Sequence, residues 1–245
     1  MKLSIREAGN PQGQAVVLLH AFPMSGAMWE PQLEALKAFR VLIPDLRGFG
    51  ATSFVGPWLV EHAAADVLES IEGKAAFVGL SMGGYVALQI AASAPERVAG
   101  LVLSDTRAEP DANENKLKRA AAIDFVRKNG VEAFLGPFLK DAVANQSAMP
   151  FLHAISAKSS PEAVMAALAA LAARPDAVPG LSKITVPTAV LVGSQDKITP
   201  LPLAEAMRSR VAGAELHIIP DAGHFSNAEN PAAFNERLVS FLKRL

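Results

Sequence analysis

Residues 75–94 read AAFVGLSMGGYVALQIAASA, with no charged side chain among them. The first five residues are almost wholly apolar and predict a buried β-strand, and the residues from Tyr85 onward predict an apolar helix. Between them, Gly79 and Gly83 flank Ser81 in a Gly-x-Ser-x-Gly motif. A strand that runs directly into a helix needs a sharp turn, across which larger side chains at the two glycine positions would collide. The stretch therefore predicts a strand, a tight turn that exposes the Ser81 hydroxyl, and a helix.

Similar apolar runs recur along the chain. Six short runs are nearly continuously apolar, which is typical of parallel strands that are covered on both faces. They are residues 15–20, 40–44, 75–79, 98–104, 187–193 and 214–220. Segments with helical spacing lie between them, including residues 61–72 and 231–245. This alternation predicts a mostly parallel, doubly wound α/β sheet with helices on both faces.

The alternation stops between residues 107 and 183. This region contains no convincing strand and three helical patterns, at residues 120–128, 131–139 and 161–173. We therefore expect one α/β core formed by residues 1–106 and 184–245, with residues 107–183 inserted as a helical cap subdomain above the sheet. A chain of 245 residues is long enough for one such core.

The composition limits the class of protein. Hydrophobic residues make up 51% of the chain and charged residues 19%, as in globular proteins. The net charge of −1, without a basic stripe, argues against a nucleic-acid partner. The absence of cysteine excludes disulfides and a cysteine nucleophile and fits a cytoplasmic location. The charged residues near Arg6 do not resemble an export signal, and the glycines within residues 75–95 argue against a membrane span.

A serine hydroxyl is a weak nucleophile at neutral pH and needs a base within hydrogen-bond reach. Of the five histidines, His224 follows the last apolar run, in the sequence Asp-Ala-Gly-His-Phe. Loops at the carboxyl ends of parallel strands are where α/β sheets build their sites. His217 lies inside a predicted strand and His153 inside the helical region, so neither is well placed. We predict Ser81 as the catalytic nucleophile and His224 as the general base.

An acid is expected to orient the histidine. In hydrolases that carry their serine on such a turn, this acid lies between the serine and the histidine in the chain. Asp196 follows the predicted strand at residues 187–193, and Asp105 follows the one at residues 98–104. We favour Asp196, because its strand is next in sequence to the one that precedes His224, so the two loops become neighbours if these strands pair. Asp105 is the alternative.

The alkoxide that forms when a serine attacks a carbonyl group needs two hydrogen-bond donors. One is expected to be the backbone N–H of Met82, the residue after the nucleophile, and the other to come from the loop after the first central strand. That strand ends in His20-Ala21-Phe22-Pro23. We therefore predict the Phe22 N–H as the second oxyanion donor, with His20 shaping the loop.

Taken together, these motifs resemble the α/β-hydrolase superfamily along nearly the whole chain. The landmarks, in order, are His20-Ala21-Phe22-Pro23, Trp29, DLRGFG at residues 45–50, the GLSMG motif, residues 193–200 and Gly223-His224-Phe225. The chain is most similar to the group of arylesterases, cofactor-free haloperoxidase-like enzymes and enol-lactone hydrolases. The resemblance implies an eight-stranded sheet with a helical cap. Because the N-terminal β region is short, we expect one edge strand to be reduced or absent.

The resemblance and the motifs lead to one main functional hypothesis. We expect a carboxylesterase that acts on small, largely apolar substrates through an acyl-enzyme, with no metal and no cofactor. Apolar side chains that follow the strands or belong to the helical region are expected to line the substrate pocket. They are Met24, Ile198, Phe225, Phe125, Phe134 and Phe138.

Two other hypotheses remain open. A lactonase or C–C bond hydrolase of aromatic catabolism, such as a 3-oxoadipate enol-lactonase, would need a cation for the substrate carboxylate. Arg107, Lys116 or Arg119 would be available for this. A non-catalytic relative that only binds a ligand is the third hypothesis, against which the complete serine, aspartate and histidine set argues. The expected partner is a small-molecule ester or lactone, not a nucleic acid or a membrane, and the oligomeric state is left open.

Overall fold

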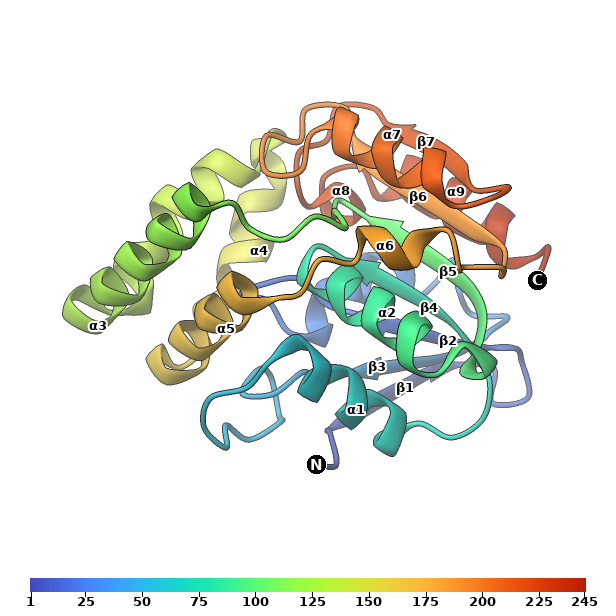
Figure 1. Ribbon diagram of the computed structural model, residues 1–245, viewed down its shortest axis with the longest axis horizontal. Helices are drawn as coiled ribbons and strands as arrows, with labels where there is room; N and C mark the ends of the chain where they lie inside the picture. Colours follow the sequence, from blue (N-terminus) through green and yellow to red (C-terminus); the bar gives the residue numbers. More distant parts are fainter.

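The central element of the fold is a seven-stranded sheet, seen in a computed structural model that describes all 245 residues (Figure 1). The strand order is β1-β3-β2-β4-β5-β6-β7. Neighbouring strands are parallel except for β1, which pairs antiparallel with β3 at one edge. The strands are β1 (Ile5–Gly9), β2 (Ala15–Leu19), β3 (Arg40–Pro44), β4 (Ala75–Leu80), β5 (Val98–Ser104), β6 (Thr188–Gly193) and β7 (Glu215–Ile219).

Helices cover both faces of the sheet. Successive residues of a strand point to opposite faces, and both sets are apolar here, so each face has to be covered. In β2, for example, Val17 and Leu19 pack in one core layer and Val16 and Leu18 in the other. The first layer includes α1, α2 and α7, and the second includes η1 and α9. These helices are η1 (Gly26–Gln32), α1 (Val60–Ser70), α2 (Met82–Ser93), α7 (Leu201–Arg210) and α9 (Pro231–Leu242), with the short η2 (Pro95–Arg97) after α2. The predicted doubly wound α/β fold is confirmed.

All six predicted strands are present, with ends that differ by at most about one residue from the apolar runs. The sequence pattern does not predict β1, because its sequence, Ile-Arg-Glu-Ala-Gly, contains no apolar run and is not buried. The sheet has one strand fewer than the eight that the resemblance implies. This agrees with the expectation that the short N-terminal region leaves an edge strand out.

The chain between β5 and β6 contains helices only. They are α3 (Asn113–Ala142), η3 (Gln146–Ala148), α4 (Met149–Ser156), α5 (Pro161–Ala173) and α6 (Val178–Leu181). α3 is broken at Gly130, whose φ of 80° lies in the left-handed region that glycine tolerates. The two helices expected at residues 120–128 and 131–139 therefore form the two halves of α3. α3, α4 and α5 lie together beyond one end of the sheet (Figure 1).

The uncharged stretch at residues 75–94 forms the centre of the fold and is not one long helix. It divides into β4, which pairs with β2 and β5, and α2, most of which is buried. No helix of this protein combines the length and the apolar character that crossing a membrane requires.

A single buried carboxylate holds the loop after β7 against the helical insertion. Glu229, at the end of the short helix α8 (Ser226–Glu229), is 4% exposed. Its Oε2 atom accepts hydrogen bonds from the backbone N–H groups of Ala144 (2.7 Å), Asn145 (2.8 Å) and Gly223 (2.9 Å). Its Oε1 atom accepts one from the N–H of Phe225 (3.0 Å). The side chain thereby satisfies four backbone donors and fixes this loop relative to the end of α3.

We expect Glu229→Gln to lower the free energy of unfolding by about 1–3 kcal/mol, because an amide NH2 group would face a buried N–H in place of an oxygen. Denaturation midpoints in urea at pH 7 measure this change. The matched control is Glu236→Gln on α9, whose side chain is 68% exposed and should tolerate the change. Equal midpoints for the two variants would mean that the Glu229 network contributes nothing to stability.

Candidate active site

Ser81 lies at the turn between β4 and α2. Its backbone has a φ of 53° and a ψ of −111°, a conformation that is disfavoured for residues other than glycine. At this turn a Cβ on Gly79 would collide with the backbone of Gly83, and a Cβ on Gly83 would collide with the backbone of Leu19. The two glycines of the motif therefore let the chain turn sharply enough to present the Ser81 hydroxyl at the carboxyl end of β4.

His224 lies within hydrogen-bond distance of Ser81. It follows β7, in the loop that Glu229 holds, and its Nε2 atom is 2.8 Å from the Ser81 Oγ. The two residues are 143 positions apart in the sequence and both are buried. A base needs this distance to take the hydroxyl proton.

Asp196 lies on the other side of the imidazole ring, with its Oδ2 atom 2.9 Å from the His224 Nδ1. β6 and β7 pair in parallel, so the loops that carry these two residues are neighbours. The Thr199 hydroxyl donates to Oδ2 (2.7 Å), and the N–H groups of Ile198 and Thr199 donate to Oδ1 (2.8 and 3.0 Å). These bonds orient the carboxylate to accept from Nδ1–H, which leaves Nε2 free to accept from Ser81.

Burial and mutual attraction oppose each other in this pair. Burial by itself raises the pKa of Asp196, but the charge and hydrogen bond of His224 and the bonds from Thr199 lower that pKa to about 2. Burial also acts to lower the pKa of His224, but the charge and hydrogen bond of Asp196 raise it above its ordinary value. Asp196 is therefore ionised at neutral pH and lies where its charge favours a protonated His224.

Asp105, the alternative acid, follows β5 and is fully buried. Its Oδ1 atom accepts a hydrogen bond from the Gly193 N–H (2.8 Å), and its Oδ2 atom accepts from the hydroxyls of Ser226 and of the preceding serine. None of its hydrogen bonds goes to His224. Burial and the nearby charge of Asp196 raise the pKa of Asp105 to about 7. The carboxylate against the imidazole is therefore that of Asp196.

The two residues predicted to supply the oxyanion donors lie at the same edge of the sheet as the serine. Phe22 is on the loop after β2, and its N–H donates no hydrogen bond within the protein. Met82 is the first residue of α2, where an N–H has no acceptor inside the helix. The His20 ring shapes the loop, accepting from the Leu46 N–H and donating to the Ala21 carbonyl, both at 2.9 Å. Both predicted donors are free, and their role stays a prediction.

A small cavity of about 50 Å³ adjoins Ser81 and His224. Of the side chains predicted for the pocket, Ile198 and Phe138 line this cavity. The other lining residues are Phe22, Tyr85, Arg107, Arg119, Leu171 and Thr199. The sequence pattern does not single out Tyr85 or Leu171, because each belongs to an apolar helix in which core residues and pocket residues look alike.

The remaining side chains predicted for the pocket do not line this cavity. Met24 and Phe225 are fully buried in the core. Phe134 stacks on Phe138, with 5.5 Å between the ring centres, and does not reach the cavity. Phe125 is on the outward face of α3 and is 43% exposed. Packing of α3 against its neighbours decides which of its phenylalanines faces the site, and spacing alone does not reveal this.

Of the three cations predicted to be available for a substrate carboxylate, two lie at the cavity and one does not. Arg107 and Arg119 line the cavity, whereas Lys116 is exposed on α3. No group of three or more histidine, aspartate and glutamate side chains is arranged to hold a metal ion.

Comparison with known proteins agrees with this architecture. A thermophilic esterase from Thermogutta terrifontis, with malate bound, has a TM-score of 0.93 and 34% identity, covering 99% of this chain and 93% of its own. The enol-lactonase from Burkholderia xenovorans has a TM-score of 0.90 and 28% identity, covering 98% and 96%. A pimeloyl-[acyl-carrier protein] methyl ester esterase of Neisseria meningitidis is 31% identical, covering 91% and 92%. Residues 16–237 match the Alpha/beta hydrolase family, and the chain therefore belongs to that family.

Proposed function

We propose that this chain is a serine hydrolase that cleaves carboxylic esters of small substrates through an acyl-enzyme. The observation that carries the proposal is the hydrogen-bonded series from the Ser81 hydroxyl through His224 to Asp196, with contacts of 2.8 and 2.9 Å. The likeness to esterases supports the same class of reaction.

Acylation begins when the Ser81 Oγ attacks the carbonyl carbon of the ester while His224 Nε2 takes its proton. The ionised Asp196 stabilises the imidazolium, in agreement with the raised pKa of His224. The N–H groups of Phe22 and Met82 are proposed to bind the alkoxide of the tetrahedral intermediate. Collapse of this intermediate breaks the ester bond, and the imidazolium gives its proton to the departing alcohol.

Deacylation repeats these steps with water as the nucleophile. His224 takes a proton from the water as it attacks the acyl-enzyme, and it returns that proton to the Ser81 Oγ when the acid product leaves. The cavity of about 50 Å³ and its apolar walls, formed by Phe22, Phe138, Leu171 and Ile198, favour a compact substrate.

A lactone is the second candidate substrate. The likeness to an enol-lactonase over 98% of this chain favours it. Opening of a lactone proceeds through the same kind of acyl-enzyme. The alcohol group formed when the ring opens stays part of the acyl chain instead of leaving. Comparison of kcat/KM for a short p-nitrophenyl ester with that for an anionic enol-lactone separates the two candidates.

We expect Ser81→Ala to lower kcat for a short p-nitrophenyl ester by roughly 10⁵- to 10⁶-fold, because the nucleophile of the proposed reaction is lost. The fold should remain, because the substitution removes only the hydroxyl oxygen, whose hydrogen bond is to His224. The purified variant should also lose labelling by a fluorophosphonate, which reacts covalently with an activated serine. Comparable activity in the variant would mean that Ser81 is not the nucleophile. Absence of both ester turnover and labelling in the native protein would favour a non-catalytic ligand-binding role.

Substitution of each aspartate by asparagine tests which acid orients the histidine. We expect Asp196→Asn to lower kcat by about 10⁴-fold, because the amide favours the wrong tautomer of His224. Asp105→Asn should lower kcat much less, because the amide can still accept from Gly193 N–H and bond to Ser226. The reverse order of the two effects would assign the role to Asp105.

The pH dependence of kcat/KM follows from the raised pKa of His224. The imidazole must be neutral to take the serine proton, so activity should rise with pH through an apparent pKa above about 6.5 and then reach a plateau. In Asp196→Asn, the residual activity should show this limb at lower pH, because the carboxylate that raises the pKa is gone. A limb that does not move in the variant would contradict the assigned coupling.

A further inference from the structure

A cluster of one carboxylate and three guanidinium groups lies beside the catalytic cavity. The Asp111 side chain is fully buried and forms ion pairs with Arg107 (2.5 Å), Arg174 (2.8 Å) and Arg119. Burial acts to raise the pKa of Asp111, but the charges and hydrogen bonds of Arg119 and Arg174 lower it below its ordinary value. No other acidic side chain pairs with these arginines. The cluster therefore holds three positive charges against one negative charge.

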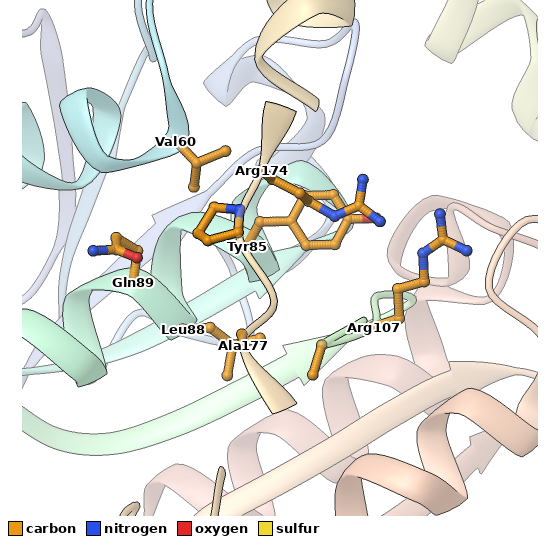
Figure 2. Close-up of a pocket in the computed structure, with 9 residues that line it drawn as sticks. Val60, Tyr85, Leu88, Gln89, Arg107, Arg174 and Ala177 are labelled. Carbon is orange, nitrogen blue, oxygen red and sulfur yellow. The ribbon is translucent and has the colours of Figure 1, made fainter. Parts of the chain in front are cut away.

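Arg174 is a structural anchor of the cluster. It is 2% exposed, and its Nη1 and Nη2 atoms donate to the carbonyl oxygens of Leu171 (2.8 Å) and Glu109 (3.0 Å). Its guanidinium carbon lies 4.3 Å from the centre of the Tyr85 ring. Figure 2 shows Arg174 lying across Tyr85, with Arg107 beside them at the edge of the neighbouring pocket. These contacts place the whole group next to the residues that line the catalytic cavity.

Arg107 and Arg119 keep most of their donors free. A guanidinium has five N–H donors in a planar fork. Arg107 gives only Nη2 to Asp111, and Arg119 gives only Nε. The Nε of Arg107 is buried and has no acceptor at all. The two side chains are 16% and 21% exposed, and their other N–H groups make no hydrogen bond within the protein, so these groups are available to a ligand that supplies an acceptor.

We propose that Arg107 and Arg119 form a subsite for a carboxylate of the substrate. Both line the cavity that holds Ser81 and His224, and the guanidinium fork matches the geometry of a carboxylate. The preferred substrates are then compact esters or lactones that carry a free carboxylate. The apolar wall contacts the part of the substrate between the ester and this carboxylate. The inference rests on the proposed function, and it replaces the expectation of a largely apolar substrate.

Two matched pairs of esters test the subsite. One pair is p-nitrophenyl hydrogen adipate and p-nitrophenyl hexanoate, which differ by a carboxylate on the acyl side. The other pair is p-acetoxybenzoate and p-tolyl acetate, which differ by a carboxylate on the alcohol side. In at least one pair we expect kcat/KM for the anionic ester to exceed that for the neutral ester by about tenfold or more.

The ratio of the two kcat/KM values should fall by about tenfold or more in Arg119→Gln, because the guanidinium that pairs with the carboxylate is lost. A ratio is used because general damage to the catalytic groups affects both esters alike. The matched control is Arg127→Gln on the same helix, whose side chain is 63% exposed and pairs with Asp124. It should leave the ratio unchanged.

If circular dichroism shows that Arg119→Gln is unfolded, Arg107→Lys replaces it. This variant keeps the charge beside Asp111 but loses the fork, so it should also lower the ratio. Turnover of the neutral esters with no preference for the anionic ones overturns the subsite alone, as does a preference that neither variant reduces. Failure to turn over any ester, together with failure of Ser81 to react with a fluorophosphonate, overturns the proposed function and the subsite with it.

Discussion

The contact between Ser81 and His224 depends on the parallel pairing of four strands. β4, β5, β6 and β7 are neighbours in the sheet, so their carboxyl ends form one edge. Ser81 follows β4, Asp196 follows β6 and His224 follows β7. Because a shift of one residue in register turns every side chain of a strand to the opposite face, the apolar residues that determine register also determine where these loops begin. The core and the site therefore share one constraint.

Three buried carboxyl groups lie near this edge, and each has different partners. Asp196 faces an imidazole and accepts from Thr199 and two backbone N–H groups, and its pKa is about 2. Asp105 also accepts three hydrogen bonds, yet its pKa is raised to about 7. Burial and the charge of Asp196, which raise this pKa, outweigh those bonds and the charge of His224, which lower it. Glu229 has four backbone donors and holds the His224 loop in place. Of the two aspartates, only Asp196 is hydrogen-bonded to the imidazole, and its pKa is the one that is lowered.

Local sequence signals predict most of the fold, because the strands are apolar runs. They also predict the candidate triad, because Ser81, Asp196 and His224 each lie within a few residues of the end of such a run. They do not predict the Glu229 network, whose donors come from two segments about 80 residues apart in the sequence. Phe125 and Phe138 are the same residue type on the same helix, and only the packing of α3 separates the exposed ring from the cavity wall. The sequence shows Arg107 and Arg119 as positively charged residues. Their shared ion pairs with Asp111 form only when the helical insertion folds, so the sequence does not predict that they lie together.

The proposed reacting groups and the side chains proposed to recognise the substrate come from different parts of the chain. The sheet and its loops carry Ser81, Asp196 and His224, whereas the helical insertion supplies Phe138, Leu171 and Arg119 to the same cavity. A substitution in the insertion can therefore change the preferred ester without moving the hydrogen bonds between the reacting groups. An esterase and an enol-lactonase share this architecture with TM-scores of 0.93 and 0.90. Since the fold is common to both, it does not by itself select a substrate, and in this chain the arginine pair at the cavity is the feature that we propose does so.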